Sequence, residues 1–404
     1  MRIFKFSPLL VGFSVAILIF VISLAVSGTF SNSLFRSGFS VTTGDVEFVK
    51  IIPSKRPGDP PIFAYWISGT RGEKEKILRL LKAVYHPRNQ YLLHLDAGAS
   101  TWERNQLSLS VQSKRVFSAF GNVNVVGRAY AVDQTGSSAL AATLHAAAVL
   151  LKISLDWDWF ITLSASDYPI VTQDDLLHAF TSLPKDLNFI QQRKEYRMTN
   201  LIVVDRNLYS SKNTRVLDSN EIRSTPDAFK IFEGSPWTIL SRPFMEYCLH
   251  GWDNLPRKLL MYFTNVAHPL EAYFQTVLCN SPQFQNTTIS NYLWYIELDT
   301  PPQVGPHALS MAHYDVMVGS GAAFARPFKE GDIVLQKVDE HILRRPSDDV
   351  VPGKWCSGCW KEGACSKWGG IDMVEPGPYG KKLKRFVSKL AAERLQSSQC
   401  NSNR

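Results

Sequence analysis

Five aspartates occur within twenty residues, in the stretch DWDWFITLSASDYPIVTQDD at 156–175. Asp156 and Asp158 form an acid-x-acid pair, and carboxylate oxygens are typical ligands of a divalent cation. The pair precedes the apolar run 159–163, which predicts a buried strand, so both carboxylates lie at the amino end of that strand. Metal-binding pairs in enzymes that use nucleotide sugars follow such a strand. We therefore expect Asp156 and Asp158 not to hold a metal.

The other three aspartates divide into a structural pair and one candidate. Thr172 and Asp175 have the spacing of a capping box, and Asp174 with Asp175 suits the positive end of a helix dipole. Asp167 follows the predicted strand, but it is a single carboxylate. If a nucleotide sugar binds there, cations must neutralise its diphosphate. The candidate cations, for each of which a solvated helix face is the alternative, are Arg326, Lys329, Arg344 and Arg345.

Glu271 is the remaining carboxylate that could do chemistry. It lies in AHPLEAYFQTVL, where His268 and Pro269 precede an amphipathic helix that we expect to begin near Leu270. A carboxylate in the first turn of a helix can simply complement the helix dipole. Held at the start of a buried helix, it can also act as a general base. The residues alone leave both interpretations open.

The elements that must position these residues are strands and helices in alternation. Apolar runs that predict strands end at Ser68–Thr70, at His94 and Asp96, and at Ser164–Asp167, with helical patterns between them. Such alternation indicates an α/β fold with a mostly parallel sheet, whose ligands bind beyond the carboxyl ends of the strands. No GxGxxG or P-loop motif is present, so a dinucleotide or ATP site of the usual kind is not supported.

The first sixty residues differ in composition from the rest of the chain. Residues 8–26 carry no charge, are long enough to cross a membrane and follow Arg2 and Lys5. We expect a single-pass, type II signal anchor from Pro8 to Val26 with a luminal body; a cleaved signal peptide is the alternative. The expected parts are a cytosolic tail at 1–7, the anchor, a luminal stem at 27–60, a catalytic domain at 61–375, and a basic tail at 376–404 that packs on the domain or extends from it.

The net charge indicates which partners to expect, and the cysteine content indicates which compartment to expect. The 404 residues carry a formal net charge of +8, which suits anionic partners, but the basic clusters have little aromatic interleaving, so nucleic acid binding is not expected. Cys356, Cys359 and Cys365 lack a second matched pair for zinc, and disulfides in an oxidising lumen are the expected alternative. Asn286 begins the only clear glycosylation sequon, which fits the same compartment.

Six stretches, in order, resemble glycosyltransferase family 14, the core-2/I-branching enzymes. They are FAYWISGT, YLLHLDAGAS, FITLSASDYPIVTQDDLL, GSPWTILSRPF, LEAYFQTVLCN and GAAFARPFKEGDIVLQKVDEHIL. The resemblance covers about residues 60–370 and is strongest to plant β-glucuronosyltransferases that act on galactans of arabinogalactan proteins. It implies a single Rossmann-like GT-A domain behind a Golgi membrane anchor. It also implies inverting transfer from UDP-glucuronic acid, without a cofactor or a divalent metal.

The resemblance also assigns roles to residues of this chain. Glu271 matches the catalytic base, Asp96 matches the acidic residue near the uracil, and Trp237 lies in the segment beside the acceptor. The donor site expected on this basis is completed by Ser68, Gly69, Asp167, Arg326 and Lys329.

Pro327 departs from the family pattern, which often has a basic residue at this position. Either Arg326 or Lys329 takes over the phosphate contact, or catalysis is weakened. Two alternatives to a glucuronosyltransferase stay open, and Pro327 bears on the second of them. One is an N-acetylglucosaminyl- or xylosyltransferase of the same fold, and the other is a catalytically weak, membrane-anchored protein that binds glycans.

Overall fold

The computed structural model describes the chain from residue 52 onward with several gaps. The described residues are 52–192, 201–210, 212–224, 226–297, 306–345, 348–357, 367–394 and 400. Within these ranges, no helix combines the length and the apolar character needed to cross a bilayer. The predicted anchor at 8–26 and most of the predicted stem lie outside the described residues, so both stay predictions.

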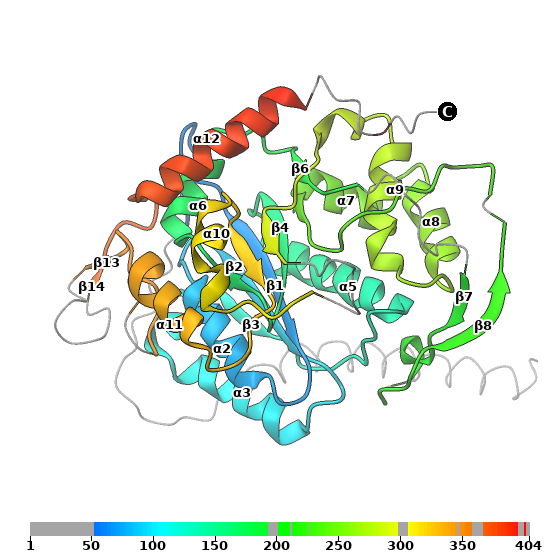
Figure 1. Ribbon diagram of the computed structural model, residues 1–404, viewed down its shortest axis with the longest axis horizontal. Coiled ribbons are helices and arrows are strands. Elements are labelled where there is room, and N and C mark those ends of the chain that lie inside the picture. Colours follow the sequence, from blue (N-terminus) through cyan, green and yellow to red (C-terminus); the bar gives the residue numbers. More distant parts are fainter. Residues whose placement is uncertain are drawn as a thin grey trace, which may run out of the picture. The chain divides into compact units, whose positions relative to one another are not determined.

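The central sheet contains four parallel strands, among them the three whose carboxyl ends the sequence predicts (Figure 1). They are β1 (Phe63–Gly69), β2 (Gln90–Leu95), β3 (Val123–Val125) and β4 (Trp159–Ser164), with β1 between β2 and β4, and β3 outside β2. β1, β2 and β4 are largely buried on both faces, whereas β3 is half-buried. In β1, Phe63, Tyr65 and Ile67 pack into one hydrophobic cluster, and Ala64 and Trp66 into another. A strand that faces two cores is apolar at every position, which explains the continuous apolar runs.

The other half of the sheet contains one reversed strand. The additional strands are β6 (Asn188–Phe189), β9 (Ile239–Ser241) and β10 (Thr288–Ile289), and the sheet order is β10-β6-β9-β4-β1-β2-β3. β9 runs antiparallel to both of its neighbours, β4 and β6, whereas β10 is parallel to β6. The prediction of an α/β fold with a mostly parallel sheet is therefore confirmed for the described residues.

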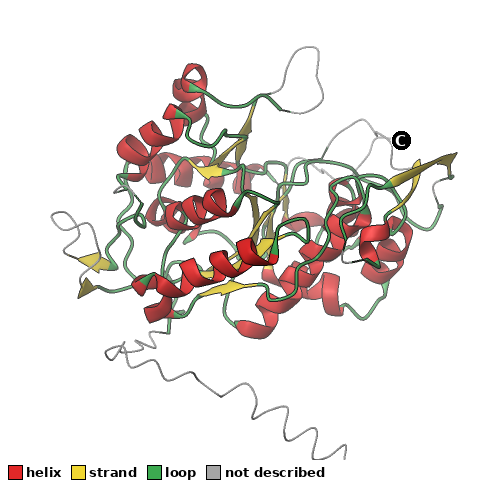
Figure 2. Ribbon diagram, turned by 90° about the horizontal axis from the view of Figure 1, so that it is seen from below, coloured by secondary structure: helices red, strands yellow, loops and turns green. Residues whose placement is uncertain are grey.

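Helices cover both faces of this sheet (Figures 1 and 2). The first hydrophobic cluster includes side chains from α2 (Lys74–Ala83), α3 (Thr101–Ser113), α4 (Arg115–Phe120), α6 (Gln173–Phe180), α11 (Ile333–Val338) and α12 (Pro378–Glu393). The second includes side chains from α5 (Ser137–Ile153), α7 (Arg242–His250), α8 (Leu255–Phe263) and α9 (Tyr273–Asn280). The result is three layers, with the sheet between two groups of helices.

A small second sheet continues beyond the carboxyl end of β4. It has the order β11-β12-β5 and consists of β11 (Trp294–Ile296), β12 (Phe324–Arg326) and β5 (Tyr168–Pro169). β12 is antiparallel to β5, so Arg326 ends a strand beside the segment that follows β4. The remaining short elements are β7 (Leu201–Val204), η1 (Arg206–Leu208), β8 (Leu217–Ile222), η2 (Pro269–Glu271), η3 (Gln285–Thr287), η4 (Met311–His313), α10 (Tyr314–Gly319), η5 (Asp339–Leu343), β13 (Cys356–Ser357) and β14 (Lys367–Trp368).

Two segments at the predicted domain borders pack on the rest of this unit. Within the predicted basic tail, residues 378–393 form α12, whose buried face includes Leu383 and Val387 in the first cluster. Near the end of the predicted stem, the side chain of Arg88 donates a 2.9 Å hydrogen bond to the carbonyl of Pro60 and also bonds to the carbonyl of Ser54. Both borders are thus held by contacts with the sheet and its helices.

Candidate active site

The acid-x-acid pair lies at the amino end of β4, as the sequence predicts, and its carboxylates are engaged there. Asp158 accepts a 2.8 Å hydrogen bond from the backbone N–H of Ile62 and forms a 2.9 Å ion pair with Lys185. Asp156 forms a 3.2 Å ion pair with Lys55 at the surface. Neither aspartate lines either of the two cavities described below. Asp158 therefore fixes the chain that enters β1, and its position does not suit a donor site.

The predicted capping box is present at the start of α6. The Thr172 side chain accepts from the backbone N–H of Asp175, and the Asp175 carboxylate accepts from that of Thr172. Asp174 accepts a 2.9 Å hydrogen bond from the backbone N–H of Glu375. Burial raises the pKa of Asp174 to about 6. Both aspartates thus serve as structural anchors.

A cleft of about 480 Å³ opens at the carboxyl ends of β1, β2 and β4. It lies where the alternation of strands and helices predicts a ligand site. All three predicted strand ends contribute side chains to it. Its lining residues are Trp66, Ser68, Gly69, Thr70, Glu73, His94, Asp96, Val132, Gln134, Ala139, Ala142, Thr143, Thr162, Leu163, Ser164, Ser166, Pro236, Trp237, His268, Leu270, Glu271 and Arg326.

Asp96 is held in a fixed orientation at the end of β2. Its backbone N–H donates to the carbonyl of Gly69, which joins the ends of β1 and β2. One carboxylate oxygen accepts a 3.0 Å hydrogen bond from the N–H of Gly98, and the other accepts a 2.8 Å bond from the side chain of Asn213. These two bonds fix the orientation of the buried carboxylate. It can therefore accept a hydrogen bond from a ligand without rearranging.

His94 forms an uncharged part of the cleft surface beside Asp96. Its ring stacks on Trp66 with the centroids 5.2 Å apart, and its Nε2 accepts a hydrogen bond from the N–H of Tyr130. Burial lowers the pKa of His94 to about 4, so the ring is uncharged at neutral pH. His94 therefore does not contribute positive charge to the cleft.

Glu271 lies at the cleft, but the local structure differs from the predicted helix start. It is the last residue of the 3₁₀ turn η2, and α9 begins only at Tyr273. Ala272, with φ −131° and ψ −31°, separates the two helical segments. The prediction that one helix begins near Leu270 is therefore wrong by about a turn. Because Glu271 precedes α9, its side chain reaches the cleft.

The backbone around Glu271 is fixed by a close approach at Gly234. The carbonyl of Glu271 accepts a 2.8 Å hydrogen bond from the N–H of Gly234. A Cβ atom at Gly234 would lie 1.7 Å from the carbonyl oxygen of Gln191, so only glycine fits there. His268, at φ +51°, adopts the left-handed backbone that directs the chain into η2. These contacts place Glu271 beside the segment that carries Trp237.

Arg326 is the cation of the cleft: no other lysine or arginine among the described residues lines it. Its guanidinium carbon lies 4.0 Å from the centroid of the Trp237 ring. Its Nε lies 3.7 Å from Oδ1 of Asp167 and has no hydrogen-bond partner. The Trp237 ring thus packs against one face of the Arg326 guanidinium, and the Asp167 carboxylate lies beside its Nε. The guanidinium is thus positioned to meet a negatively charged ligand.

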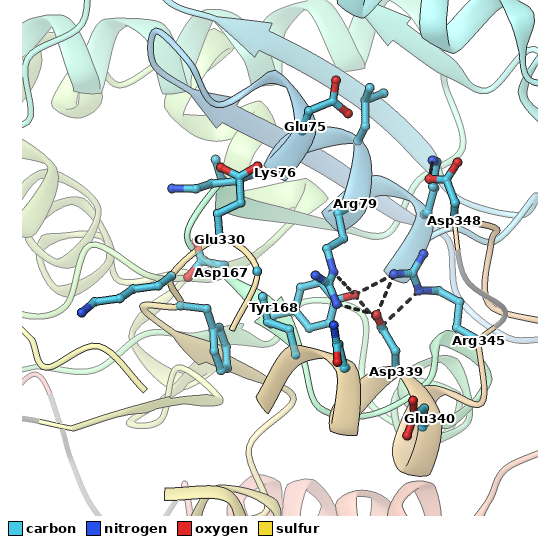
Figure 3. A pocket seen from close by; sticks show the side chains of 18 residues that line it. Glu75, Lys76, Arg79, Asp167, Tyr168, Glu330, Asp339, Glu340, Arg345 and Asp348 are labelled. Carbon is cyan, nitrogen blue, oxygen red and sulfur yellow. Dashed lines mark hydrogen bonds and ion pairs between the residues drawn. The ribbon is translucent and has the colours of Figure 1, made fainter. Parts of the chain in front are cut away.

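Asp167 and Lys329 do not line the cleft, although Asp167 contacts Arg326 from outside it. Asp167 is buried, accepts a 2.7 Å hydrogen bond from the hydroxyl of Ser164 and a 3.2 Å bond from Nε1 of Trp294, and lines a second cavity together with Lys329. In Figure 3 Asp167 is seen among the side chains of that cavity. The cleft thus brings together Ser68, Gly69, Asp96, Trp237, Glu271 and Arg326, and it excludes Asp167 and Lys329.

Several residues of the cleft were not predicted from the sequence. Val132 and Gln134 come from the loop before α5. The start of α5 is held by Asp205, which accepts a 2.7 Å hydrogen bond from the N–H of Ser138. A Cβ atom at Gly136 would lie 2.2 Å from the Asp205 carboxylate. No local pattern signals this contact, because the two segments are 67 residues apart.

The cysteines and the sequon lie away from the cleft. Cys279 and Cys400 form a disulfide, and Cys356 is also disulfide-bonded, as an oxidising compartment predicts. Cys248 is buried and has a free thiol. Asn286, in η3, is exposed, and its glycosylation stays a prediction. Within the described ranges, no group of three or more histidine, cysteine, aspartate or glutamate side chains could hold a metal ion.

Comparisons with known proteins agree with this arrangement. The family model "Core-2/I-Branching enzyme" matches residues 63–318. "Beta-glucuronosyltransferase GlcAT14A" of Arabidopsis thaliana is 42% identical over 98% of this chain and 92% of its own length. GlcAT14C of the same plant is 48% identical over 70% of this chain and 74% of its own length. Xylosyltransferase 1 of Rattus norvegicus is 32% identical over 59% of this chain but only 28% of its own length.

The family match contains the strand ends of the cleft and Glu271, and the match to GlcAT14A extends over Arg326 as well. The chain therefore belongs to the Core-2/I-branching enzyme family of glycosyltransferases.

Proposed function

We propose that this protein transfers glucuronic acid from UDP-glucuronic acid to a β-galactan with inversion at the anomeric carbon. The observation that carries the proposal is the cleft in which Glu271 and Arg326 lie at the carboxyl ends of the strands. The choice of donor is supported by the relatives, because three that are 42–48% identical are named β-glucuronosyltransferases.

Glu271 is the general base in this mechanism. Its carboxylate takes the proton of an acceptor hydroxyl, and the hydroxyl oxygen attacks the anomeric carbon from the face opposite UDP. The bond from that carbon to the diphosphate oxygen breaks, and its electron pair leaves with UDP. Because the donor linkage is α, inversion gives a β-linked product.

Arg326 stabilises the leaving diphosphate. Negative charge grows on the phosphate oxygen as the bond breaks, and a preorganised guanidinium stabilises that charge more in the transition state than in the bound donor. Trp237 and Asp167 hold Arg326 before the donor binds. The reaction then needs no divalent metal. Arg326, rather than Lys329, takes this role, because only Arg326 lines the cleft.

The other cleft residues bind the two substrates. Asp96 accepts a hydrogen bond from the uracil, and Ser68 with Gly69 lies against the nucleotide at the end of β1. Trp237 forms part of the acceptor site, and Arg326 covers one face of its ring. The acceptor is a galactan of arabinogalactan proteins, and the enzyme acts in the Golgi lumen behind an anchor at Pro8–Val26.

A panel of UDP-sugars tests the donor and the activity together. The purified luminal part is incubated with a β-galactan and UDP-glucuronic acid, UDP-N-acetylglucosamine, UDP-xylose or UDP-galactose, and the product is identified by mass and linkage. Transfer of glucuronic acid in a β-linkage is expected. Transfer of N-acetylglucosamine or xylose alone would assign the enzyme to the second activity of this fold. Binding of UDP and galactan without any transfer would identify a glycan-binding protein.

A further inference from the structure

A second cavity, about 680 Å³ in volume, adjoins the catalytic cleft. The same two segments line both. At the end of β4 and just beyond it, Ser164 and Ser166 line the cleft, whereas Ala165, Asp167 and Tyr168 line the cavity. Arg326, the last residue of β12, lines the cleft, whereas Phe328 and Lys329 line the cavity. Because the N–H of Phe328 donates to the carbonyl of Ser166, the two segments form one thin wall between the sites.

The interior of this cavity is a rigid polar network (Figure 3). Asp339 accepts from Arg79 at 2.7 Å, from Arg345 at 2.8 Å and from the hydroxyl of Tyr168 at 2.6 Å. Arg345 also donates to that hydroxyl at 3.2 Å. These mutual hydrogen bonds fix the side chains before any ligand binds, so only the donors and acceptors left over are available to a ligand, and they are held in place.

The rim and the floor of the cavity differ in character. The floor contains buried apolar side chains, including Leu78, Phe328 and Leu335. The exposed rim is polar and consists of Glu75, Lys329, Glu330, Gln336, Glu340 and Asp348. Five cationic side chains and six carboxylates line the cavity in all, so their charges nearly cancel.

This charge balance argues against a polyanionic ligand. A nucleotide or another polyanion needs an excess of cations, which the cavity lacks. A neutral sugar instead presents hydroxyls that both donate and accept, so carboxylates, cations and amides can all bind it. The volume lies within the range of about 300–1,000 Å³ that small-ligand sites occupy. The lining chemistry therefore suits an uncharged carbohydrate.

We infer that the second cavity is a subsite for the neutral galactan chain of the acceptor, remote from the galactose that reacts. This inference rests on the proposed function for the identity of the sugar. A polymer can occupy the catalytic cleft and the cavity across their shared wall, whereas a single sugar occupies only one of them. The cavity then raises the affinity for long acceptors and leaves the chemical step unchanged.

The experiment compares wild type with Gln336→Ala/Glu340→Ala, which removes two rim side chains outside the catalytic cleft. Gln112→Ala/Glu393→Ala is the matched control, because both residues are exposed on α3 and α12 and line neither cavity. Binding of uncharged β-galacto-oligosaccharides of two and of eight residues is measured by calorimetry without a donor. Binding of UDP is measured in parallel.

For the eight-residue chain we expect the rim variant to bind about tenfold more weakly, as the loss of two hydrogen bonds predicts. Its affinity for the disaccharide and for UDP should not change, and the control should match wild type throughout. In transfer assays, KM for the long acceptor should rise at constant kcat. Equal affinity of wild type and the rim variant for the long chain would overturn the inference, and so would weaker UDP binding by the rim variant.

The outcome is separable from that of the proposed function. Wild type that binds the long galactan through the rim but transfers no glucuronic acid would support the subsite and refute the proposed activity. Wild type that transfers glucuronic acid but binds long and short chains equally well would support the activity and refute the subsite.

Discussion

The carboxylates at the two ends of the central strands do different work. At the amino end of β4, Asp158 holds the chain entering β1 through the N–H of Ile62 and pairs with Lys185. At the carboxyl ends, Asp96 and Glu271 line an open cleft together with Arg326. The acid-x-acid pattern is found at the amino end, where neither Asp156 nor Asp158 lines either of the two cavities described. Position along the strand therefore indicates chemistry better than the local spacing of acids does.

The physical reason is the direction of the strands. In parallel units each strand is followed by a turn into a helix, and those turns open a crevice at the carboxyl edge. At the amino edge, chain segments arrive with backbone N–H groups that need acceptors, and a buried carboxylate satisfies them. Asp158 meets that need at β1, and Asp175 meets it at the N–H of Gly377.

The largest expected effect comes from the carboxyl end. Glu271→Gln should lower kcat by about 10²–10⁴, because the amide cannot accept the proton of the acceptor hydroxyl. Affinity for UDP, measured by calorimetry, should change little. Glu246→Gln, on the exposed side of α7 where Glu246 pairs with Arg242, is the matched control and should keep full turnover. A folded Glu271→Gln protein with normal kcat would remove Glu271 from the role of base.

Arg326→Ala should lower kcat by about 10²–10³, the usual loss on removing one preorganised charge contact. Arg115→Ala is a matched control, since Arg115 also packs on an indole, with its guanidinium carbon 5.7 Å from the Trp368 ring centroid, but lies outside the cleft. Initial rates at saturating donor provide the comparison. Equal losses in the two variants would mean that Arg326 acts only through packing.

The buried carboxylate of Asp174 should make the stability of the fold, rather than turnover, depend on pH. Its folded pKa of about 6 exceeds the ordinary value of 3.8, so its stabilising contribution is present below pH 4 and is lost as pH rises through 6. Relative to Asp174→Asn, wild type should lose about 3 kcal/mol of unfolding free energy between pH 4 and pH 7. Denaturant titrations of both proteins across this range measure it. A difference that does not vary with pH would contradict the burial of a charged Asp174.

Asp158→Asn should cost about 1–3 kcal/mol of unfolding free energy, because one buried hydrogen bond and the Lys185 ion pair are weakened. Turnover per folded molecule should stay at the wild-type value. Asp156→Ala is the control, because its pair with Lys55 is at the surface and such pairs contribute about 0–1 kcal/mol. A drop in kcat for Asp158→Asn without loss of stability would place chemistry at the amino end.

Local patterns predicted much of the fold, and the limits of prediction have a physical basis. The strands β1, β2 and β4 follow from continuous apolar runs, and the capping box at Thr172 follows from its spacing. The reversed strand β9 could not be predicted, because its direction depends on pairing with β4 some 80 residues earlier.

The site shows the same limit. Glu271 and Arg326 could be predicted from motifs, but the stacking of Arg326 on Trp237 joins residues on separate elements. Arg326 and Lys329 looked equivalent in sequence, yet the chain leaves β12 between them and directs the two side chains to different cavities. The second cavity itself depends on a contact between Arg79 and Asp339, which are 260 residues apart.

Chelation of divalent metal ions tests the contrast between the amino and carboxyl ends of the central strands most directly. The initial rate of glucuronic acid transfer is measured for wild type after dialysis against EDTA, and again after addition of manganese. If Arg326 stabilises the diphosphate, the rate should be the same after dialysis against EDTA and after addition of manganese. This should hold for wild type and for Asp158→Asn alike. Loss of transfer on chelation with recovery by manganese would contradict it and would make Asp156 and Asp158 the first carboxylates to re-examine.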